Sequence, residues 1–463
     1  MTPTCSFSRP LLTIATLVLA VLLASACGGD GDDAAPYLEP GGCDLAPYAW
    51  LPRGDVGAVL HHDEDVLSPM AAAAIDGLLP EGYDFFVPVP YGARLFRVRY
   101  TTQDRGRAVE ATGMVGLPHG DVAAGEEVPM VLWTHGTTGF THACAPSAAG
   151  VEHALLIYLV ASLGYVVVAP DFIGLDGEAD FGQPPLVRHA YLSIEQTAIG
   201  SLDMVRAVRA LLAQSPDLTV PMRDDLAVWG ISQGGHAALA AELLAPYYAP
   251  EERVVATVAA VPPTDLMGIA DYAISEPNPA TAGTAAMLVS AHYWYEGEEP
   301  FADLLSSDLP WDVAGTLPEA LYAGCDAGDV LDGATAVEHV YNADLVAGLG
   351  GSWAGADPWS CYLRESSFAT TSIPRISDSP VLFVLGEDDT LVYSPVIRDD
   401  FDRLCGLGYR LEYLECAGAE HVEAAVWSMP EQVAWLEDRL AGVPLDPVTE
   451  CHRTAPVTCE GQY

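Results

Sequence analysis

The sequence predicts an α/β fold built on a mostly parallel, doubly wound sheet with an insertion late in the chain. Short apolar runs alternate with amphipathic stretches from residue 93 onward, as a sheet covered by helices on both faces requires. One apolar run ends in the turn Gly230-Ile231-Ser232-Gln233-Gly234, and a helix rich in small residues follows it. An aromatic, irregular stretch at 262–376 then interrupts the alternation before it resumes.

The predicted elements follow one another in a regular order. The runs at 95–101 and 110–117 are expected to form an antiparallel pair. Most later strands are continuously apolar, which is typical of parallel strands buried on both faces. The predicted strands are 95–101, 110–117, 129–134, 165–169, 226–231, 254–261, 380–385 and 409–414, and the predicted helices are 151–163, 193–213, 237–244, 394–404 and 431–440.

The interruption at 262–376 precedes the last two predicted strands. In open α/β sheets, ligands bind at the carboxyl edge of the strands, and an insertion at this point is expected to cover that edge as a cap. Aromatic side chains suit a cap because they wall off an apolar pocket. The alternative is a structural insertion that only packs on the core. The aromatic residues in question are Tyr293, Trp294, Tyr295, Trp311, Tyr322, Trp353 and Trp359.

The N-terminus has the pattern of an export signal. Arg9 precedes an apolar run at 11–23, and Ala-Ser-Ala at 24–26 is typical of a cleavage site. The run is too short for a comfortable membrane span. Cys27 follows at once, and residues 22–27 resemble a bacterial lipoprotein box. Cys27 is therefore predicted to be the lipidated first residue of an exported, membrane-anchored chain, and ordinary secretion after the same cleavage is the alternative.

These observations divide the chain into six regions. Beyond the signal, no apolar run is long enough to cross a bilayer. We expect a signal peptide at 1–26, a flexible acidic linker at 27–42, the first part of the α/β core at 43–264, the cap at 265–375, the second part of the core at 376–442 and a C-terminal tail at 443–463.

The charge balance excludes one class of partner. Acidic residues number 64 against 19 basic ones, all of them arginine, and the formal net charge is −45. A surface this acidic repels phosphate backbones and anionic lipids, so binding to nucleic acid or to an anionic membrane surface is not expected.

The cysteines indicate an oxidising compartment. With Cys5 and Cys27 set aside, eight cysteines remain, which in an exported chain predicts four disulfides. The short-range pairings Cys405–Cys416 and Cys451–Cys459 are the first expectation. No Cys-x-x-Cys spacing or His/Cys cluster indicates a zinc site.

The turn at 230–234 has the Gly-x-Ser-x-Gly pattern of a nucleophile elbow. In such an elbow a serine sits on a strained strand-to-helix turn with its hydroxyl exposed above the sheet edge. Because the pattern also arises by chance, the strand before it and the helix after it carry the interpretation. Ser232 is the predicted nucleophile, and a structural Gly-Ser turn is the alternative.

A serine nucleophile needs a histidine base and a carboxylate that orients it. In this strand–turn–helix context the order is serine, acid, histidine, each after a strand. His421 follows the last predicted strand and is the predicted base, whereas His452 lies in the tail. Asp389 follows the strand at 380–385 and is the predicted acid, with Asp388 as the rival because one residue of register decides which side chain points inward.

Two backbone N–H groups are expected to form the oxyanion hole. The residue after the nucleophile, Gln233, supplies one, and Thr137 supplies the other from the loop after the strand at 129–134. His135 in that loop and His236 in the elbow helix are interpreted as structural residues. No metal or cofactor is required by this chemistry.

Several stretches in this order resemble the secretory lipase family of α/β hydrolases, to which the fungal lipase A type and bacterial relatives belong. The resemblance implies the α/β-hydrolase fold, ester hydrolysis and a cap between the elbow and the acid strand. The extreme acidity and the predicted lipid anchor depart from the family pattern. The matching stretches are 99–104, 134–139, 144–147, 168–175 and 230–235, together with the loops of Asp389 and His421.

The sequence thus predicts an exported carboxylic-ester hydrolase that forms an acyl-enzyme on Ser232 and acts on a small-molecule or lipid ester. One alternative is a serine peptidase on the same fold, although no propeller-sized N-terminal domain is present to sieve peptides. The other is an inactive hydrolase-fold surface protein that binds a ligand, against which the complete Ser–Asp–His set argues.

The predicted anchor is tested by lipid labelling. In a bacterial host supplied with radioactive palmitate, we expect the wild-type chain to be labelled and Cys27→Ser to lose the label, because Cys27 is the residue that the box marks for lipidation. Labelling that survives the substitution would contradict the prediction.

Overall fold

The computed structural model describes residues 36–79, 86, 88–120, 127–148, 150–175, 187–218, 220–325, 328–331 and 333–462. The predicted signal segment, Cys27 and most of the predicted linker lie outside these ranges. No helix among the described residues is long and apolar enough to span a membrane.

The strands in the described ranges form one nine-stranded sheet of order β1-β2-β3-β5-β4-β6-β7-β8-β9. The pairs from β1 to β5 are antiparallel, and the pairs from β5 through β4 to β9 are parallel. The mostly parallel sheet confirms the predicted fold class. The strands are β1 (Val59–Glu64), β2 (Gly92–Asp104), β3 (Arg107–His119), β4 (Val128–Thr134), β5 (Val166–Pro170), β6 (Met222–Ile231), β7 (Arg253–Ala260), β8 (Pro380–Gly386) and β9 (Arg410–Cys416).

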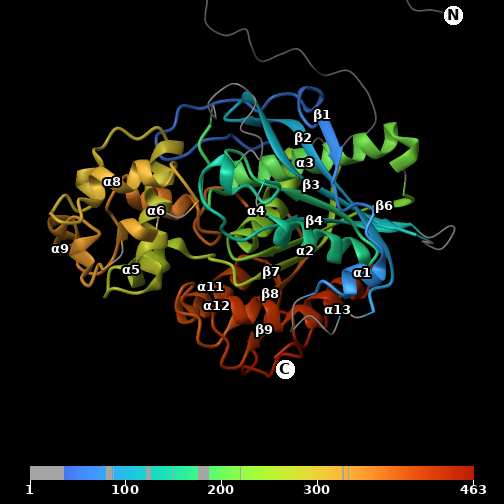
Figure 1. Cartoon of the computed structure of the whole chain (residues 1–463). Coiled ribbons are helices and arrows are strands. Elements are labelled where there is room, and N and C mark those ends of the chain that lie inside the picture. The colour runs from blue at the N-terminus through green and yellow to red at the C-terminus, as the bar shows by residue number, and fades with distance from the viewer. Residues whose placement is uncertain are drawn as a thin grey trace, which may run out of the picture. The chain divides into compact units, whose positions relative to one another are not determined.

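Helices cover both faces of this sheet (Figure 1). Alternate residues of β4 show the two layers: Val131 and Trp133 pack in a cluster with α2 and α13, whereas Met130 and Leu132 pack with α3 and α4. This alternation explains why β4 is apolar up to Trp133. One face carries α2 (Val151–Ser162), α12 (His421–Trp427) and α13 (Met429–Leu440), the other carries α3 (Ile194–Gln214), α4 (Gln233–Tyr248) and α11 (Ser394–Gly406), and α1 (Ala72–Asp76) lies beside α2.

All the strands and helices predicted from the sequence are present, with shifted ends. The helix after the elbow begins at Gln233, four residues earlier than predicted. The short strand β1 was not predicted because five of its six residues are exposed, so it lacks a buried apolar face. Helix α12 has only seven residues and is too short for a periodic signal.

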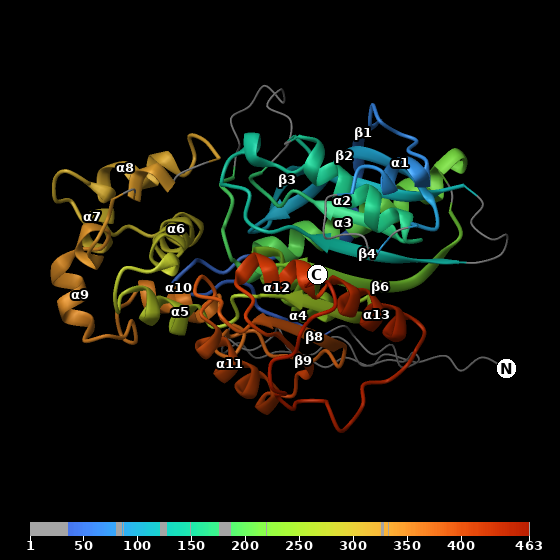
Figure 2. The same cartoon turned by 60° about the horizontal axis from the view of Figure 1, so that its bottom comes forward.

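The chain between β7 and β8, residues 261–379, is the β7–β8 insertion. It is helical where the sequence was interpreted as irregular, and Figures 1 and 2 show its helices gathered beside one end of the sheet. Helix α6 begins with a capping box at Asn278 followed by Pro279, both strong start signals. The described helices are α5 (Leu266–Ala273), α6 (Pro279–Trp294), α7 (Phe301–Leu304), α8 (Val313–Ala320), α9 (Ala343–Leu349) and α10 (Trp359–Glu365).

Four disulfides lie within the described ranges, but the predicted short-range pairings are wrong. The bonds are Cys43–Cys361, Cys144–Cys325, Cys405–Cys451 and Cys416–Cys459. Cys405 precedes β9 and Cys416 ends it, so the strand separates them by about 20 Å, far beyond the span of a disulfide.

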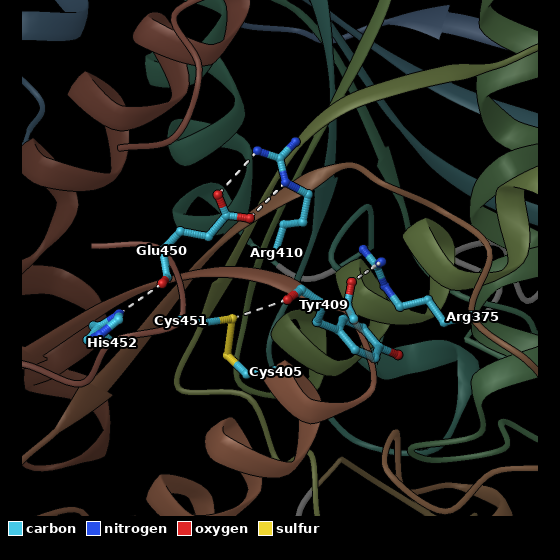
Figure 3. Close-up of a disulfide and its surroundings, with 8 residues drawn as sticks. Arg375, Cys405, Tyr409, Arg410, Glu450, Cys451 and His452 are labelled. Atoms are coloured by element: carbon cyan, nitrogen blue, oxygen red, sulfur yellow. Dashed lines mark hydrogen bonds and ion pairs between the residues drawn. A yellow bond between two sulfur atoms is a disulfide. The ribbon is translucent and has the colours of Figure 1, made fainter. Parts of the chain in front are cut away.

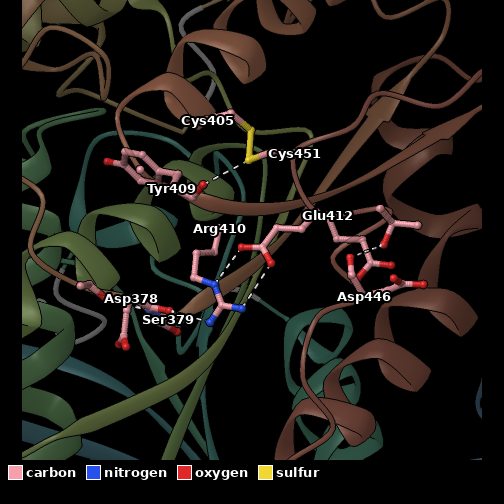
Figure 4. Close-up of polar contacts among 12 residues, drawn as sticks. Asp378, Ser379, Cys405, Tyr409, Arg410, Glu412, Asp446 and Cys451 are labelled. Carbon is pink, nitrogen blue, oxygen red and sulfur yellow. Dashed lines mark hydrogen bonds and ion pairs between the residues drawn. A yellow bond between two sulfur atoms is a disulfide. The ribbon is translucent and has the colours of Figure 1, made fainter.

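The C-terminal tail pairs with both of these cysteines because it returns beside β9. The N–H of Cys451 donates to the carbonyl oxygen of Leu411 at 2.7 Å, and that of Val457 donates to the carbonyl oxygen of Glu415 at 2.8 Å. Figure 3 shows Cys405–Cys451 beside the Arg410–Glu450 ion pair, whose nearest N–O distance is 2.9 Å. Arg410 also lies 3.5 Å from the carbonyl oxygen of Asp378 (Figure 4).

The disulfide connectivity predicts the result of non-reducing peptide mapping. Proteolysis should yield linked peptides for Cys405–Cys451 and Cys416–Cys459, and none for the short-range pairs. Removing the first bond with Cys405→Ala/Cys451→Ala should lower the free energy of unfolding by about 4 kcal/mol, because the closed loop no longer restricts the unfolded chain. Peptides linking Cys405 to Cys416 would contradict the structure.

Candidate active site

Ser232 occupies a strained turn between β6 and α4. Its backbone has φ 58° and ψ −119°, a conformation that costs energy for a residue with a side chain. The N–H of Ser232 donates to the carbonyl oxygen of Ala260 at 2.8 Å, which fixes the turn against the end of β7. A Cβ on Gly230 would lie 1.9 Å from the carbonyl oxygen of Gly234, and a Cβ on Gly234 would lie 1.9 Å from that of Thr134. Glycine is therefore required on both sides.

The structure brings the three predicted triad side chains together. His421 Nε2 lies 2.8 Å from Ser232 Oγ, and His421 Nδ1 lies 2.6 Å from Asp389 Oδ2. A carboxylate oxygen accepts hydrogen bonds, so Nδ1 carries the ring proton and Nε2 accepts the proton of the serine hydroxyl. Proton transfer from Ser232 to His421 therefore needs no rearrangement of either residue.

Asp389, and not its rival Asp388, faces the histidine. Its side chain is buried, with 2% exposure, and Oδ1 accepts the N–H groups of Leu391 and Val392, both at 2.9 Å. These bonds leave Oδ2 aimed at the imidazole. Asp388 is exposed, and its backbone N–H donates to the carbonyl oxygen of Ala419 at 3.0 Å.

His421 is the first residue of α12. Glu420 before it forms a capping box with Glu423, so the start of the helix, and with it the position of the imidazole, is fixed locally. The other candidate base, His452, is exposed in the tail and contacts the carbonyl oxygen of Glu450 at 3.1 Å.

The two predicted oxyanion donors lie beside Ser232. Gln233 is the first residue of α4, where backbone N–H groups have no partner within the helix. The loop after β4 passes close by, since a Cβ on Gly136 would lie 3.8 Å from Ser232 Cβ. Thr137, the next residue, lines the same cavity as Ser232.

His135 and His236 occupy structural positions, as predicted. His135 stacks on Phe172 with a centroid separation of 4.3 Å, and burial lowers its pKa to about 4. His236 Nε2 lies 2.9 Å from the carbonyl oxygen of Ser366, and burial likewise lowers its pKa to about 4. Both rings are therefore neutral at physiological pH.

Two residues that contact the predicted oxyanion donors were not predicted from the sequence. His189 Nε2 lies 2.7 Å from the side-chain Nε2 of Gln233, and the Tyr191 hydroxyl lies 3.0 Å from Thr137 Oγ1. They precede α3 in a stretch with no recognisable pattern, so no sequence signal could have placed them at the site.

An open cavity is lined in part by Ser232. Its polar lining residues include Thr137 and Tyr191, and leucine, isoleucine, methionine and valine make up half of its lining residues. The β7–β8 insertion supplies about half of this lining from α5, α6 and α10, and an apolar lining of this kind suits an apolar ligand. The residues from these helices are Leu266, Ile269, Ala280, Gly283, Thr284, Met287 and Leu363.

Among the described residues, no group of three or more His, Cys, Asp or Glu side chains is arranged to hold a metal ion. Ser232 lines the cavity, and behind it His421 contacts both Ser232 and Asp389.

The sheet, its helical layers and the elbow at the end of β6 define an α/β-hydrolase fold. The model of the family described as "Secretory lipase" matches residues 143–292 and 360–447. The chain belongs to the secretory lipase family.

Individual relatives are more distant. Lipase A of Arthroderma benhamiae is 26% identical over 298 residues, which cover 63% of this chain but only 56% of that protein. Among solved structures, the rice cell wall degrading esterase LipA from Xanthomonas oryzae aligns with a TM-score of 0.63 at 18% identity, covering 83% of this chain and 98% of that one. Candida antarctica lipase A in its closed state aligns with a TM-score of 0.61 at 16% identity, covering 87% and 85%. At these identities the two structures show a shared fold.

The contact between Asp389 and His421 predicts unequal effects at neighbouring aspartates. Asp389→Asn should lower kcat for an ester substrate by about 10⁴-fold, because the amide favours the wrong imidazole tautomer. The matched control Asp388→Asn should stay within about twofold of wild type, since that side chain is exposed. Steady-state kinetics on p-nitrophenyl butyrate compares the two variants, and a larger loss in Asp388→Asn would contradict this placement.

Proposed function

We propose that this protein is a carboxylic-ester hydrolase in which Ser232 is the nucleophile, His421 the general base and Asp389 the orienting acid. The observation that carries the proposal is the pair of hydrogen bonds at His421, 2.8 Å to Ser232 Oγ and 2.6 Å to Asp389 Oδ2. Membership of the secretory lipase family supports the same chemistry.

The proposed reaction has two halves. Ser232 Oγ forms a bond to the ester carbonyl carbon while its proton passes to His421 Nε2, and the negative charge on the carbonyl oxygen is stabilised by the N–H groups of Thr137 and Gln233. The C–O bond to the alcohol then breaks, and His421 returns the proton to the leaving oxygen. Water repeats the sequence on the acyl-enzyme, releasing the acid and restoring Ser232.

The β7–β8 insertion acts as the cap in this proposal. Its α5 and α6 residues supply apolar wall to the cavity at Ser232, which suits the acyl group of a small-molecule or lipid ester. The Asp389 carboxylate and the His421 imidazole lie at the sheet edge, beside the elbow. In this proposal the reacting carbonyl of the substrate therefore lies against the elbow, and the apolar part of the substrate lies against the cap.

Export belongs to the same proposal. Four disulfides within the described residues suit an oxidising compartment, as does membership of a secretory family. Attachment to a membrane through Cys27 remains a prediction from the sequence.

The proposed activity is tested with p-nitrophenyl esters of graded acyl length beside peptide p-nitroanilides. We expect ester turnover by the wild-type protein and a loss of about 10⁴-fold or more in Ser232→Ala, because no other group replaces the nucleophile. The matched control Ser275→Ala removes an exposed serine hydroxyl that bonds to the carbonyl oxygen of Tyr272, and should leave turnover unchanged.

An ester hydrolase, a peptidase and a binding protein give different outcomes in this assay. Turnover of anilides but not of esters would indicate a peptidase, and turnover of neither would indicate a binding protein. Equal ester turnover in wild type and Ser232→Ala would overturn the assignment of the nucleophile.

A further inference from the structure

Residues 188–192, the bridging segment, connect both predicted oxyanion donors to the β7–β8 insertion. From this segment the imidazole of His189 contacts the side chain of Gln233, with 2.7 Å between the two Nε2 atoms. The hydroxyl of Tyr191 contacts Thr137 Oγ1 at 3.0 Å. Residues 189–191 therefore contact both of the residues that are predicted to form the oxyanion hole.

The contact from His189 has a defined direction. His189 Nδ1 lies 3.2 Å from the carbonyl oxygen of Ile173, which can only accept, so Nδ1 carries the ring proton and Nε2 accepts an amide proton from Gln233. Burial lowers the pKa of His189 to about 3, with buried His135 adding to the effect. The ring is therefore neutral and keeps this tautomer across the physiological pH range.

Ser290 of α6 holds the bridging segment from the insertion side. Its hydroxyl donates to the carbonyl oxygen of His189 at 2.8 Å and accepts the N–H of Tyr191 at 2.8 Å. The Tyr322 hydroxyl donates to the same carbonyl oxygen at 3.3 Å. The Arg188 guanidinium lies 3.7 Å from the centroid of the Tyr293 ring, so a cation–π contact adds to this attachment.

The end of the bridging segment is strained. Leu192 is buried and has φ 58°, a left-handed conformation that a leucine rarely adopts. Strain of this kind persists only where surrounding contacts over-determine the backbone. Here those contacts are the bonds to Ser290 on one side and the Ser193 cap of α3 on the other.

We propose that His189 and Tyr191 are positioning residues for the oxyanion hole and that Ser290 of α6 holds both of them in place. The position of the β7–β8 insertion on the core then determines the positions of the two N–H donors. The inference rests on the proposed ester hydrolysis and adds the residues that control it. An oxyanion donor is effective only at about 2.7–3.1 Å from the developing charge, and a misplacement of about 1 Å costs about 10²-fold in rate.

The test compares Tyr191→Phe and Ser290→Ala with wild type on a p-nitrophenyl ester. Each variant should lower kcat by about 10- to 100-fold while KM changes by less than about twofold, because substrate contacts remain and only transition-state stabilisation is lost. A trifluoromethyl ketone, which forms a tetrahedral oxyanion adduct on the serine, should lose affinity by the same factor as kcat. A merely structural role would not couple these two quantities.

Thr281 on the same helix provides a matched control. Its hydroxyl also accepts one backbone N–H, from Asn278 at 3.1 Å, and donates to one backbone carbonyl oxygen, that of Ala273 at 3.0 Å. It does not contact the bridging segment, so Thr281→Val should leave kcat and ketone affinity within about twofold of wild type.

The possible results distinguish a failure of this inference from a failure of the proposed function. If wild type hydrolyses esters but Tyr191→Phe and Ser290→Ala both keep wild-type kcat, this inference is overturned and the proposed function stands. An equal loss of kcat in Thr281→Val would also overturn it. A wild-type protein without ester turnover would overturn both, and if Ser290→Ala fails to fold, Tyr191→Phe alone decides.

Discussion

The close approach of the start of α4 to the end of β4 is the constraint on which the site depends. The Thr134 hydroxyl donates to the carbonyl oxygen of Gly234 at 2.7 Å, and the backbone of Gly234 lies so close to Thr134 that a Cβ has no room. Thr134 is paired with Gly230 across the parallel strands. This contact holds Ser232 in its strained turn and also fixes the chain from which His135, Gly136 and Thr137 follow.

The parallel sheet supplies the rest of the geometry. Strands β4, β6, β8 and β9 all end at the same edge, and the loop of Thr137, the elbow, Asp389 and His421 follow them in that order. Each side chain comes from a short connection directly after a buried strand, so its position is set by the sheet. A scaffold of this kind holds reactive groups in place on short loops.

Acidic side chains lie in the interior of the fold as well as on its surface. Glu195 is buried, with its Oε1 accepting from the Trp50 indole at 2.8 Å and from the Tyr48 hydroxyl, and burial raises its pKa to about 7. Glu242 pairs with Arg375 at 2.8 Å where both side chains are almost fully buried. With arginine as the only basic side chain besides histidine, ion pairs of this kind use its planar, multi-donor geometry.

The sequence alone determined the features that depend on local chain chemistry. The Gly-x-Ser-x-Gly pattern fixed the elbow, since only glycine fits beside Thr134, and the apolar runs fixed which strands are buried. The order of the loops after those strands singled out His421 and the neighbouring pair Asp388 and Asp389, because parallel strands bring their carboxyl ends to one edge.

Only the tertiary structure decided the contacts between distant segments. The choice between Asp388 and Asp389 depends on one residue of turn register, and the disulfide partners depend on a tail that returns beside β9. His189, Tyr191 and Ser290 meet because three separate elements pack together, and none of them has a local pattern. Local patterns follow from the backbone conformation of a few residues. Contacts between distant residues depend instead on the packing of the whole fold, which no short stretch of sequence specifies.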